Sequence, residues 1–209
     1  MKIITQALCL AILVWPSIAE ARMITYPGGV TVMTMNDVDT NTVEGYYTVT
    51  PKYAVGVRHD YWRDSKANMD AAQISYLVKR WNNQGSQANF YLHSGVGVAY
   101  EDGDTEPAAF AGIEADWENR RFYTSYHNMF LTAGDIRSEA SHTARVGVAP
   151  YLGDYGDLHT WLILQADYNP QDDDDFSVTP LVRFYKGTSL LEAGVNLDGG
   201  VLFHFMHAF

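Results

Sequence analysis

Short segments in which apolar and polar residues alternate recur along most of the chain, separated by clusters of turn-forming residues. Alternation with a period of two is the pattern of a β-strand that has one apolar face. Most segments have about nine to eleven residues, which is the length that a tilted strand needs to cross a bilayer. We therefore predict about twelve strands, with ten as the alternative count. Their ranges are 25–36, 42–50, 53–62, 71–81, 88–99, 108–117, 121–131, 142–151, 158–168, 176–185, 189–197 and 199–209.

The connections between these segments fall into two classes. Short turns are predicted at 50–52, 82–87, 118–120, 153–156 and 186–188. Longer, acidic connections are predicted at 63–70, 101–107, 133–141 and 169–175. Short turns on one side and longer loops on the other are typical of a closed antiparallel up-and-down β-barrel. A soluble sheet shows the same alternation, so the pattern alone does not exclude an exported β-sandwich.

Charged residues of the predicted strands fall mainly on one face. In the segment 53–62, for example, Val55 and Val57 share one face, and Arg58 and Asp60 share the other. In a barrel the charged face lines the lumen, where charges must be paired or hydrated. The lumen is then either a salt-bridged plug or a narrow watery passage with a weak preference for cations. The predicted lumenal charges are Arg58, Asp60, Lys79, Glu114, Asp116, Arg145, Asp167, Arg183 and Glu192.

The chain ends on an aromatic strand, with Phe203, Phe205 and the terminal Phe209 on one face. This ending resembles the closing strand of Gram-negative outer-membrane β-barrels, which the barrel-assembly machinery reads as an insertion signal. Residues 1–21 combine Lys2, a short apolar core and a small-x-small cleavage site at 19–21, so we predict a cleaved signal peptide. An N-terminal membrane anchor is the alternative.

The resemblance covers residues 22–209 as one barrel domain. It implies a location in the outer membrane of a Gram-negative bacterium, with membrane lipid, lipopolysaccharide and the assembly machinery as partners. It specifies fold and location and says nothing specific about a substrate.

Composition narrows the function further. The formal net charge of −11 argues against nucleic acid as a partner. The single cysteine lies at position 9, within the predicted signal peptide, so we expect no disulfide in residues 22–209. Acidic runs at 101–104 and 172–175 are candidates for weak Ca²⁺ binding. Neither run has EF-hand spacing, and a solvated loop beside lipopolysaccharide is the favoured interpretation.

A candidate soft-metal site involves the first and last predicted strands. Met33 and Met35 share a face of the first strand, and His204 and Met206 share a face of the last. Barrel closure makes these strands neighbours, and thioether and imidazole ligands together suit Cu(I). The competing interpretation is that methionine fills gaps and histidine packs in a polar lumen. A shift of one residue would disperse the cluster.

We find no catalytic arrangement in the sequence. Outer-membrane lipid hydrolases need Ser and His on one outward face, but Ser94 follows His93 directly and His142 follows Ser141 directly. Ser125 and His127 share a face that is predicted to point inward. The sequence thus favours a narrow cation-tolerant channel or a copper-associated envelope protein without enzymatic activity. The alternatives are a closed structural or binding barrel and, less favoured, a lipid-modifying hydrolase.

Overall fold

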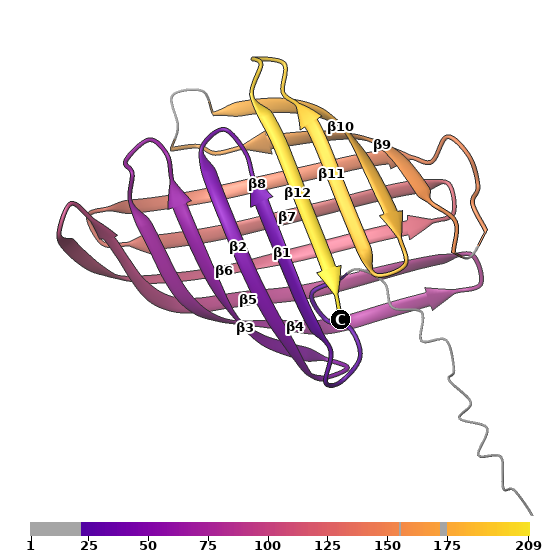
Figure 1. Cartoon of the computed structure of the whole chain (residues 1–209), viewed down its shortest axis with the longest axis horizontal. Coiled ribbons are helices and arrows are strands. Elements are labelled where there is room, and N and C mark those ends of the chain that lie inside the picture. The colour runs from indigo at the N-terminus through magenta and orange to yellow at the C-terminus, as the bar shows by residue number, and fades with distance from the viewer. Residues whose placement is uncertain (1–21, 155, 172–174) are drawn as a thin grey trace, which may run out of the picture.

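The computed structural model describes residues 22–154, 156–171 and 175–209, which form twelve antiparallel strands in a single closed barrel (Figure 1). Each strand pairs with its neighbours in sequence, and β1 pairs with β12 to close the barrel. The predicted all-β up-and-down barrel of about twelve strands is confirmed, and closure of one sheet excludes a sandwich. The predicted signal peptide lies outside the described residues.

The strands are β1 (Val30–Asn36), β2 (Thr40–Thr50), β3 (Tyr53–Trp62), β4 (Asn68–Asn83), β5 (Ser86–Glu101), β6 (Asp104–Asn119), β7 (Phe122–Ala133), β8 (Arg137–Val148), β9 (His159–Tyr168), β10 (Phe176–Lys186), β11 (Ser189–Val195) and β12 (Val201–Ala208). No helix among the described residues is long and apolar enough to span a membrane.

The wall of the barrel is uneven in height. Strands β4, β5 and β6 have 16 residues each, whereas β1 and β11 have 7. The predicted loop at 101–107 is wrong, because β5 and β6 are joined by a tight hairpin at Asp102 and Gly103. Both residues have positive φ (49° and 100°), as a type I′ turn requires. Strand pairing therefore continues to Glu101 and Asp104.

The connections define two ends of the barrel. At the terminal end, where the C-terminus lies, the connections are 51–52, 84–85, 120–121, 149–158 and 187–188. At the loop end they are 37–39, 63–67, 102–103, 134–136, 169–175 and 196–200. The predicted short turns are confirmed at the terminal end except for 149–158, which is longer than expected.

Alternation places apolar side chains outside and polar side chains inside. Val57 and Val96 project outward and are about two-thirds exposed, whereas Asp60 and Glu192 project inward and are fully buried. This is the reverse of a soluble protein, where charged residues are rarely buried. The outer surface therefore suits contact with lipid, and the polar chemistry of the molecule lies in the lumen.

A β-bulge in β4 places the side chain of one predicted lumenal residue on the outer face of the barrel. Leu77 pairs with Tyr91 of β5, but Lys79 pairs with Phe90, so Val78 is the extra residue. The Lys79 side chain lies on the outer face, with its ammonium 4.9 Å from the centre of the Trp81 ring. The prediction that Lys79 lines the lumen is wrong. Arg80 takes the inward position instead and donates a hydrogen bond to Asn89 Oδ1 (2.6 Å).

The first described residues, 22–25, lie inside the barrel. The predicted first strand began at residue 25, but pairing begins only at Val30. Ile24 is buried among lumenal side chains, and the Thr25 N–H donates to Thr48 Oγ1 (3.1 Å). Thr31 Oγ1 donates to the Arg22 carbonyl (3.1 Å). These contacts hold residues 22–25 against the inner wall, whereas Tyr26 is exposed and Gly28 and Gly29 form backbone hydrogen bonds with Thr48 of β2.

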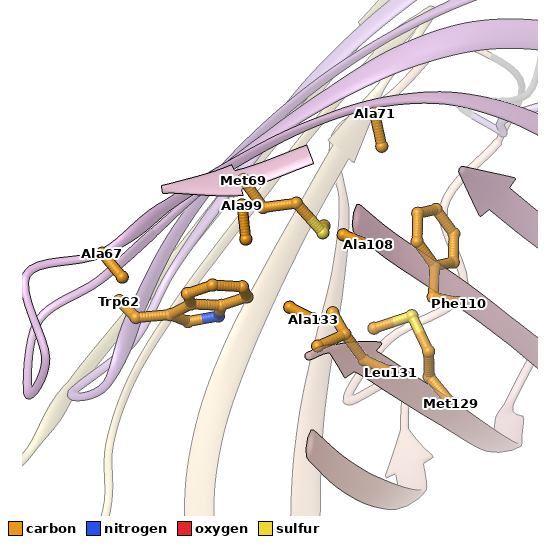
Figure 2. Close-up of a cluster of buried hydrophobic side chains, with 10 residues drawn as sticks. All are labelled: Trp62, Ala67, Met69, Ala71, Ala99, Ala108, Phe110, Met129, Leu131 and Ala133. Atoms are coloured by element: carbon orange, nitrogen blue, oxygen red, sulfur yellow. The ribbon is translucent and has the colours of Figure 1, made fainter. Parts of the chain in front are cut away.

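Two apolar clusters fill part of the interior. The loop-end cluster joins β3 to β7, and its side chains point toward one another (Figure 2). Its members are Trp62, Ala67, Met69, Ala71, Ala99, Ala108, Phe110, Met129, Leu131 and Ala133. The seam cluster surrounds the inner face of β1 and β12 and includes Ile24, Met33, Tyr46, Ala54, Leu77, Tyr91, Leu190 and Met206. The polar lumen lies between these clusters.

Candidate functional site: the barrel lumen

A cavity of about 590 Å³ occupies the lumen. At the terminal end it reaches Gly85 and Asn119, and at the loop end it reaches Asn36 and Asp37. Its wall therefore extends from one end of the barrel to the other. Charged and aromatic side chains line the part between the ends.

One group of lumenal charges is centred on Arg58 of β3. Its Nε donates to Asp60 Oδ2 (2.7 Å), and its Nη1 donates to Glu44 Oε1 on β2 (3.3 Å). Thr42 Oγ1 donates to the other oxygen of Asp60 (2.6 Å). The guanidinium also lies 5.2 Å from the centre of the Phe110 ring. Two carboxylates thus share one guanidinium, which leaves this side of the lumen with a surplus of acid.

A second group is centred on Glu192 of β11, which is fully buried. Arg183 Nε donates to its Oε1 (2.5 Å), while Arg145 Nη1 donates to its Oε2 (3.3 Å). His204 Nδ1 lies 2.9 Å from the same Oε2. Two guanidiniums here share one carboxylate. Around Glu192 itself, base is therefore in surplus, opposite in sign to the Arg58 group.

Histidines form a third group near the middle of the wall. His93 Nδ1 and Ser75 Oγ share a hydrogen bond (2.9 Å), and His93 Nε2 lies 3.4 Å from Glu114 Oε2. The rings of His93 and His127 are 6.0 Å apart between centres. Ser125 lines the same cavity as His127, as predicted. The Ser and His pair therefore faces the lumen, away from the outer surface where a lipid substrate would lie.

The N-terminal segment supplies a charge that the sequence analysis did not assign to the lumen. Arg22 pairs with Asp116 (Nη1 to Oδ1, 3.5 Å) and with Glu118 on the terminal end of β6. Asn89 also donates to Asp116 Oδ1 (2.8 Å). The sequence carried no signal for this contact, because a residue before the first strand has no predicted face.

The remaining predicted lumenal acid, Asp167, accepts hydrogen bonds from Thr143 (2.8 Å) and Gln165 (2.7 Å). Gln165 in turn accepts from Arg145 Nε (2.8 Å), which links this acid to the Glu192 group. The structure places every predicted lumenal charge on the inner wall except Lys79.

The soft-metal candidates come together at the seam between β1 and β12. Met33 lies directly opposite Met206, and Met35 lies opposite His204. All four side chains line the lumenal cavity. Three or more His, Cys, Asp or Glu residues do not gather as a metal site anywhere in the part of the chain that the structure describes. A metal at the seam would therefore depend on thioether sulfur.

The loop end carries most of the exposed acids. Arg137 Nη1 lies 3.1 Å from Asp64 Oδ2, and its Nε donates to Glu139 (2.5 Å). Burial raises the pKa of Asp64, but the Ser65 N–H and the Arg137 guanidinium outweigh this effect and leave that pKa below its ordinary value. Of the two acidic runs, 101–104 forms the tight β5–β6 hairpin, and residues 172–174 of the other lie outside the described residues.

The aromatic residues of the last strand face outward. Phe203, Phe205 and Phe209 are all exposed and alternate with the lumenal His204 and Met206. The Phe209 N–H donates to the Val30 carbonyl (2.8 Å), so the C-terminal residue still takes part in closing the barrel. The three aromatic rings are therefore presented on the outer surface, next to the seam.

No protein-family model matches the chain, and no curated protein matches it in sequence. Among solved structures, the KdgM porin in complex with disordered oligogalacturonate is similar in fold, with a TM-score of 0.50 and 8% identity. The match covers 87% of this chain and 98% of that one. The KdgM porin has the same TM-score and coverage at 9% identity. Omp33 from Acinetobacter baumannii has a TM-score of 0.40 at 8% identity and covers 90% of this chain and 99% of that one. The likeness to the KdgM porin, together with the closed twelve-stranded sheet, shows that the chain has the fold of outer-membrane β-barrels, as the resemblance of its last strand implied.

Proposed function

We propose that this protein is a narrow outer-membrane channel for small polar solutes, with a weak preference for cations. The observation that carries the proposal is the lumenal cavity, whose lining runs from Gly85 at the terminal end to Asp37 at the loop end. The apolar outer wall supports a position in a bilayer. Export by the predicted signal peptide, insertion by the barrel-assembly machinery and contact with lipopolysaccharide belong to the same proposal.

The lumen favours small solutes because much of its cross-section is filled. The loop-end cluster and residues 22–25 occupy opposite ends of the interior, and the charged groups between them are paired. One similar structure is that of a porin in complex with oligogalacturonate, an acidic oligosaccharide. A passage for such anions would be expected to present unpaired bases. Arg58 and Arg22 here each face two carboxylates, and Arg145 and Arg183 are both paired with Glu192. We therefore propose a solute class different from acidic oligosaccharides.

Cation preference follows from the charges at the mouth. Within the described loops, Asp37, Asp39, Asp64 and Asp135 surround the loop end. Acids at a pore mouth raise the local concentration of cations and repel anions. The lumen itself contains both signs, so the preference is expected to be modest and to weaken at high salt, where surface charges are screened.

Single-channel conductance tests the proposal. Residues 22–209 are refolded, folding is checked by a heat-dependent gel shift, and current is recorded in a planar bilayer across a KCl gradient. We expect small currents whose reversal potential indicates K⁺ over Cl⁻. In Arg22→Ala the N-terminal segment loses its anchor on β6, and the conductance should rise. Lys52→Ala, in an exposed turn, is the matched control and should behave as the wild type.

A silent bilayer from a correctly folded barrel would overturn the channel proposal. It would favour the closed structural or binding barrel, in which the ion pairs and the two apolar clusters act as a plug. Association with copper at the cell envelope is a second candidate function. The observation that favours it is the pairing of Met33 with Met206 and of Met35 with His204 across the seam.

A further inference from the structure

Two neighbouring rows of inward-facing side chains cross the β1–β12 seam. The first row runs Arg58, Glu44, Met33, Met206, Leu190, each residue the cross-strand partner of the next. The second row runs Asp60, Thr42, Met35, His204, Glu192 in the same way. Directly opposed residues on one face have Cβ atoms about 4.5–5.5 Å apart. Three thioethers and one imidazole therefore form a compact square on the inner wall.

The imidazole of His204 is held in the orientation of a metal ligand. Its Nδ1 lies 2.9 Å from Glu192 Oε2, so Nδ1 donates its N–H to that carboxylate, and in the neutral imidazole Nε2 carries the lone pair. Nε2 is buried and has no hydrogen-bond partner among the described residues. A histidine that binds a metal through one nitrogen commonly donates the other N–H to a carboxylate. Burying a nitrogen without a partner costs free energy, and a metal ligated by Nε2 would remove that cost.

The inward-facing residues next to His204 on the seam are soft. Met33 and Met206 are 5% and 6% exposed, and both line the cavity together with Met35. Thioether sulfur is a poor hydrogen-bond acceptor but a good ligand for soft metal ions, and imidazole suits copper. A set of three thioethers and one neutral imidazole carries no charge. It therefore favours a monovalent soft ion over a divalent hard one.

The charges around the square also fit a monovalent cation. Glu44, the β2 neighbour of Met33, shares the guanidinium of Arg58 with Asp60. This leaves one carboxylate charge without a full counterion, next to Met33. The guanidiniums of Arg145 and Arg183 are held at Glu192, so Glu192 lies between them and His204. The carboxylate of Glu44 on β2 would balance a single positive charge at the square.

We propose that Met33, Met35, Met206 and His204 form a binding site for Cu(I), with Glu192 as the residue that positions the imidazole. The site does not depend on the barrel conducting, because it is built on the wall. The competing role for these side chains is apolar packing, since Met33 and Met206 also contact Ile24 and Tyr46 in the seam cluster. The two roles differ in what they predict for added metal.

The test is a titration of the refolded barrel with Cu(I) under anaerobic reducing conditions, in competition with a chromogenic Cu(I) chelator. We expect one Cu(I) per barrel. Replacement of Met33 and Met206 by leucine keeps the apolar volume and should weaken binding at least tenfold. His204→Gln keeps a donor for Glu192 and should weaken it by a similar factor. Met69→Leu, in the loop-end cluster, is the matched control and should bind as the wild type.

A second measurement locates the ion without relying on variants. In protein with ¹³C-labelled methionine methyl groups, Ag(I) serves as an air-stable substitute for Cu(I). The NMR signals of Met33, Met35 and Met206 should shift, whereas those of Met69 and Met129 should not. Absence of chelator-competitive binding in the folded wild type would overturn the proposal. So would equal weakening by Met69→Leu, or shifts confined to the loop-end methionines.

Discussion

Replacement of Glu192 by glutamine should be among the most destabilising single changes in the barrel. Glu192 is fully buried and is the shared acceptor of Arg183 (2.5 Å), Arg145 (3.3 Å) and His204 (2.9 Å). Glutamine keeps the shape but removes the charge, so the Arg145 and Arg183 guanidiniums lose the carboxylate that they share. Removal of one partner from a buried ion pair typically costs about 3–5 kcal/mol.

We expect the lower part of that range, about 3 kcal/mol, because both arginines keep other contacts. Arg145 Nε still donates to Gln165 (2.8 Å), and the Arg183 guanidinium still lies 4.4 Å from the centre of the Tyr123 ring. A change of about 3 kcal/mol lowers the folding equilibrium constant by roughly two orders of magnitude.

The assay is equilibrium unfolding of the refolded barrel by guanidinium chloride in lipid vesicles, followed by tryptophan fluorescence. Asp154→Asn is the control, because Asp154 is almost fully exposed and lies 3.8 Å from Arg120. Exposed ion pairs contribute little to stability, so this variant should unfold close to the wild type. A loss below about 1 kcal/mol for Glu192→Gln would refute the claim that the buried charge of this carboxylate is needed.

Three further changes test other parts of the structure. Gly97→Ala should cost about 1–3 kcal/mol or prevent refolding, because its Cβ would lie 2.0 Å from a backbone oxygen of β4. Gly85→Ala, which meets open space, should refold as the wild type in a heat-dependent gel-shift assay. Lys79→Ala should leave conductance and ion selectivity unchanged, because the side chain lies outside the pore; altered selectivity would contradict the bulge. The lowered pKa of Asp64 adds stability above its ordinary pKa, and this is lost as the pH falls through the folded value. Asp64→Asn should therefore reduce the stability difference between pH ~7 and pH ~3, and an unchanged difference would exclude this role.

Much of the fold follows from the sequence because one repeated pattern determines it. Alternation at Val55, Val57, Arg58 and Asp60 assigns the faces of a strand without knowledge of its neighbours, and the structure agrees. Length, turn residues and the aromatic last strand then give the closed barrel. The mixed-sign interior also follows, since most charged residues of the strands share a face.

The sequence predictions that failed concern an irregularity within one strand and contacts across the lumen. The bulge at Val78 shifts the faces by one residue, and nothing in the local sequence marks it. The segment 22–29 has an apolar content that fits a strand, yet Ile24 packs inside the barrel. The contact of Arg22 with β6 joins residues far apart in sequence. Periodicity carries no information about such contacts.

The sequence predicted the residues of the candidate metal site but not their arrangement in space. Strand order brought Met33 and Met206 together once the barrel closed, and a shift of one residue would have separated their faces. The role of Glu192 as the partner of His204 Nδ1 could not be inferred beforehand, because it requires the exact register of β11 against β12.

Closure of the barrel by its first and last strands also constrains how the molecule can fold. The pairing of Thr31 with Ala208 joins residues from nearly opposite ends of the chain. Loop closure over such a distance is slow, and until it occurs the edges of β1 and β12 expose unpaired backbone groups. A partial chain that lacks β12 cannot complete the barrel, because β1 then has no closing partner. The molecule must therefore be protected from aggregation until β12 is available.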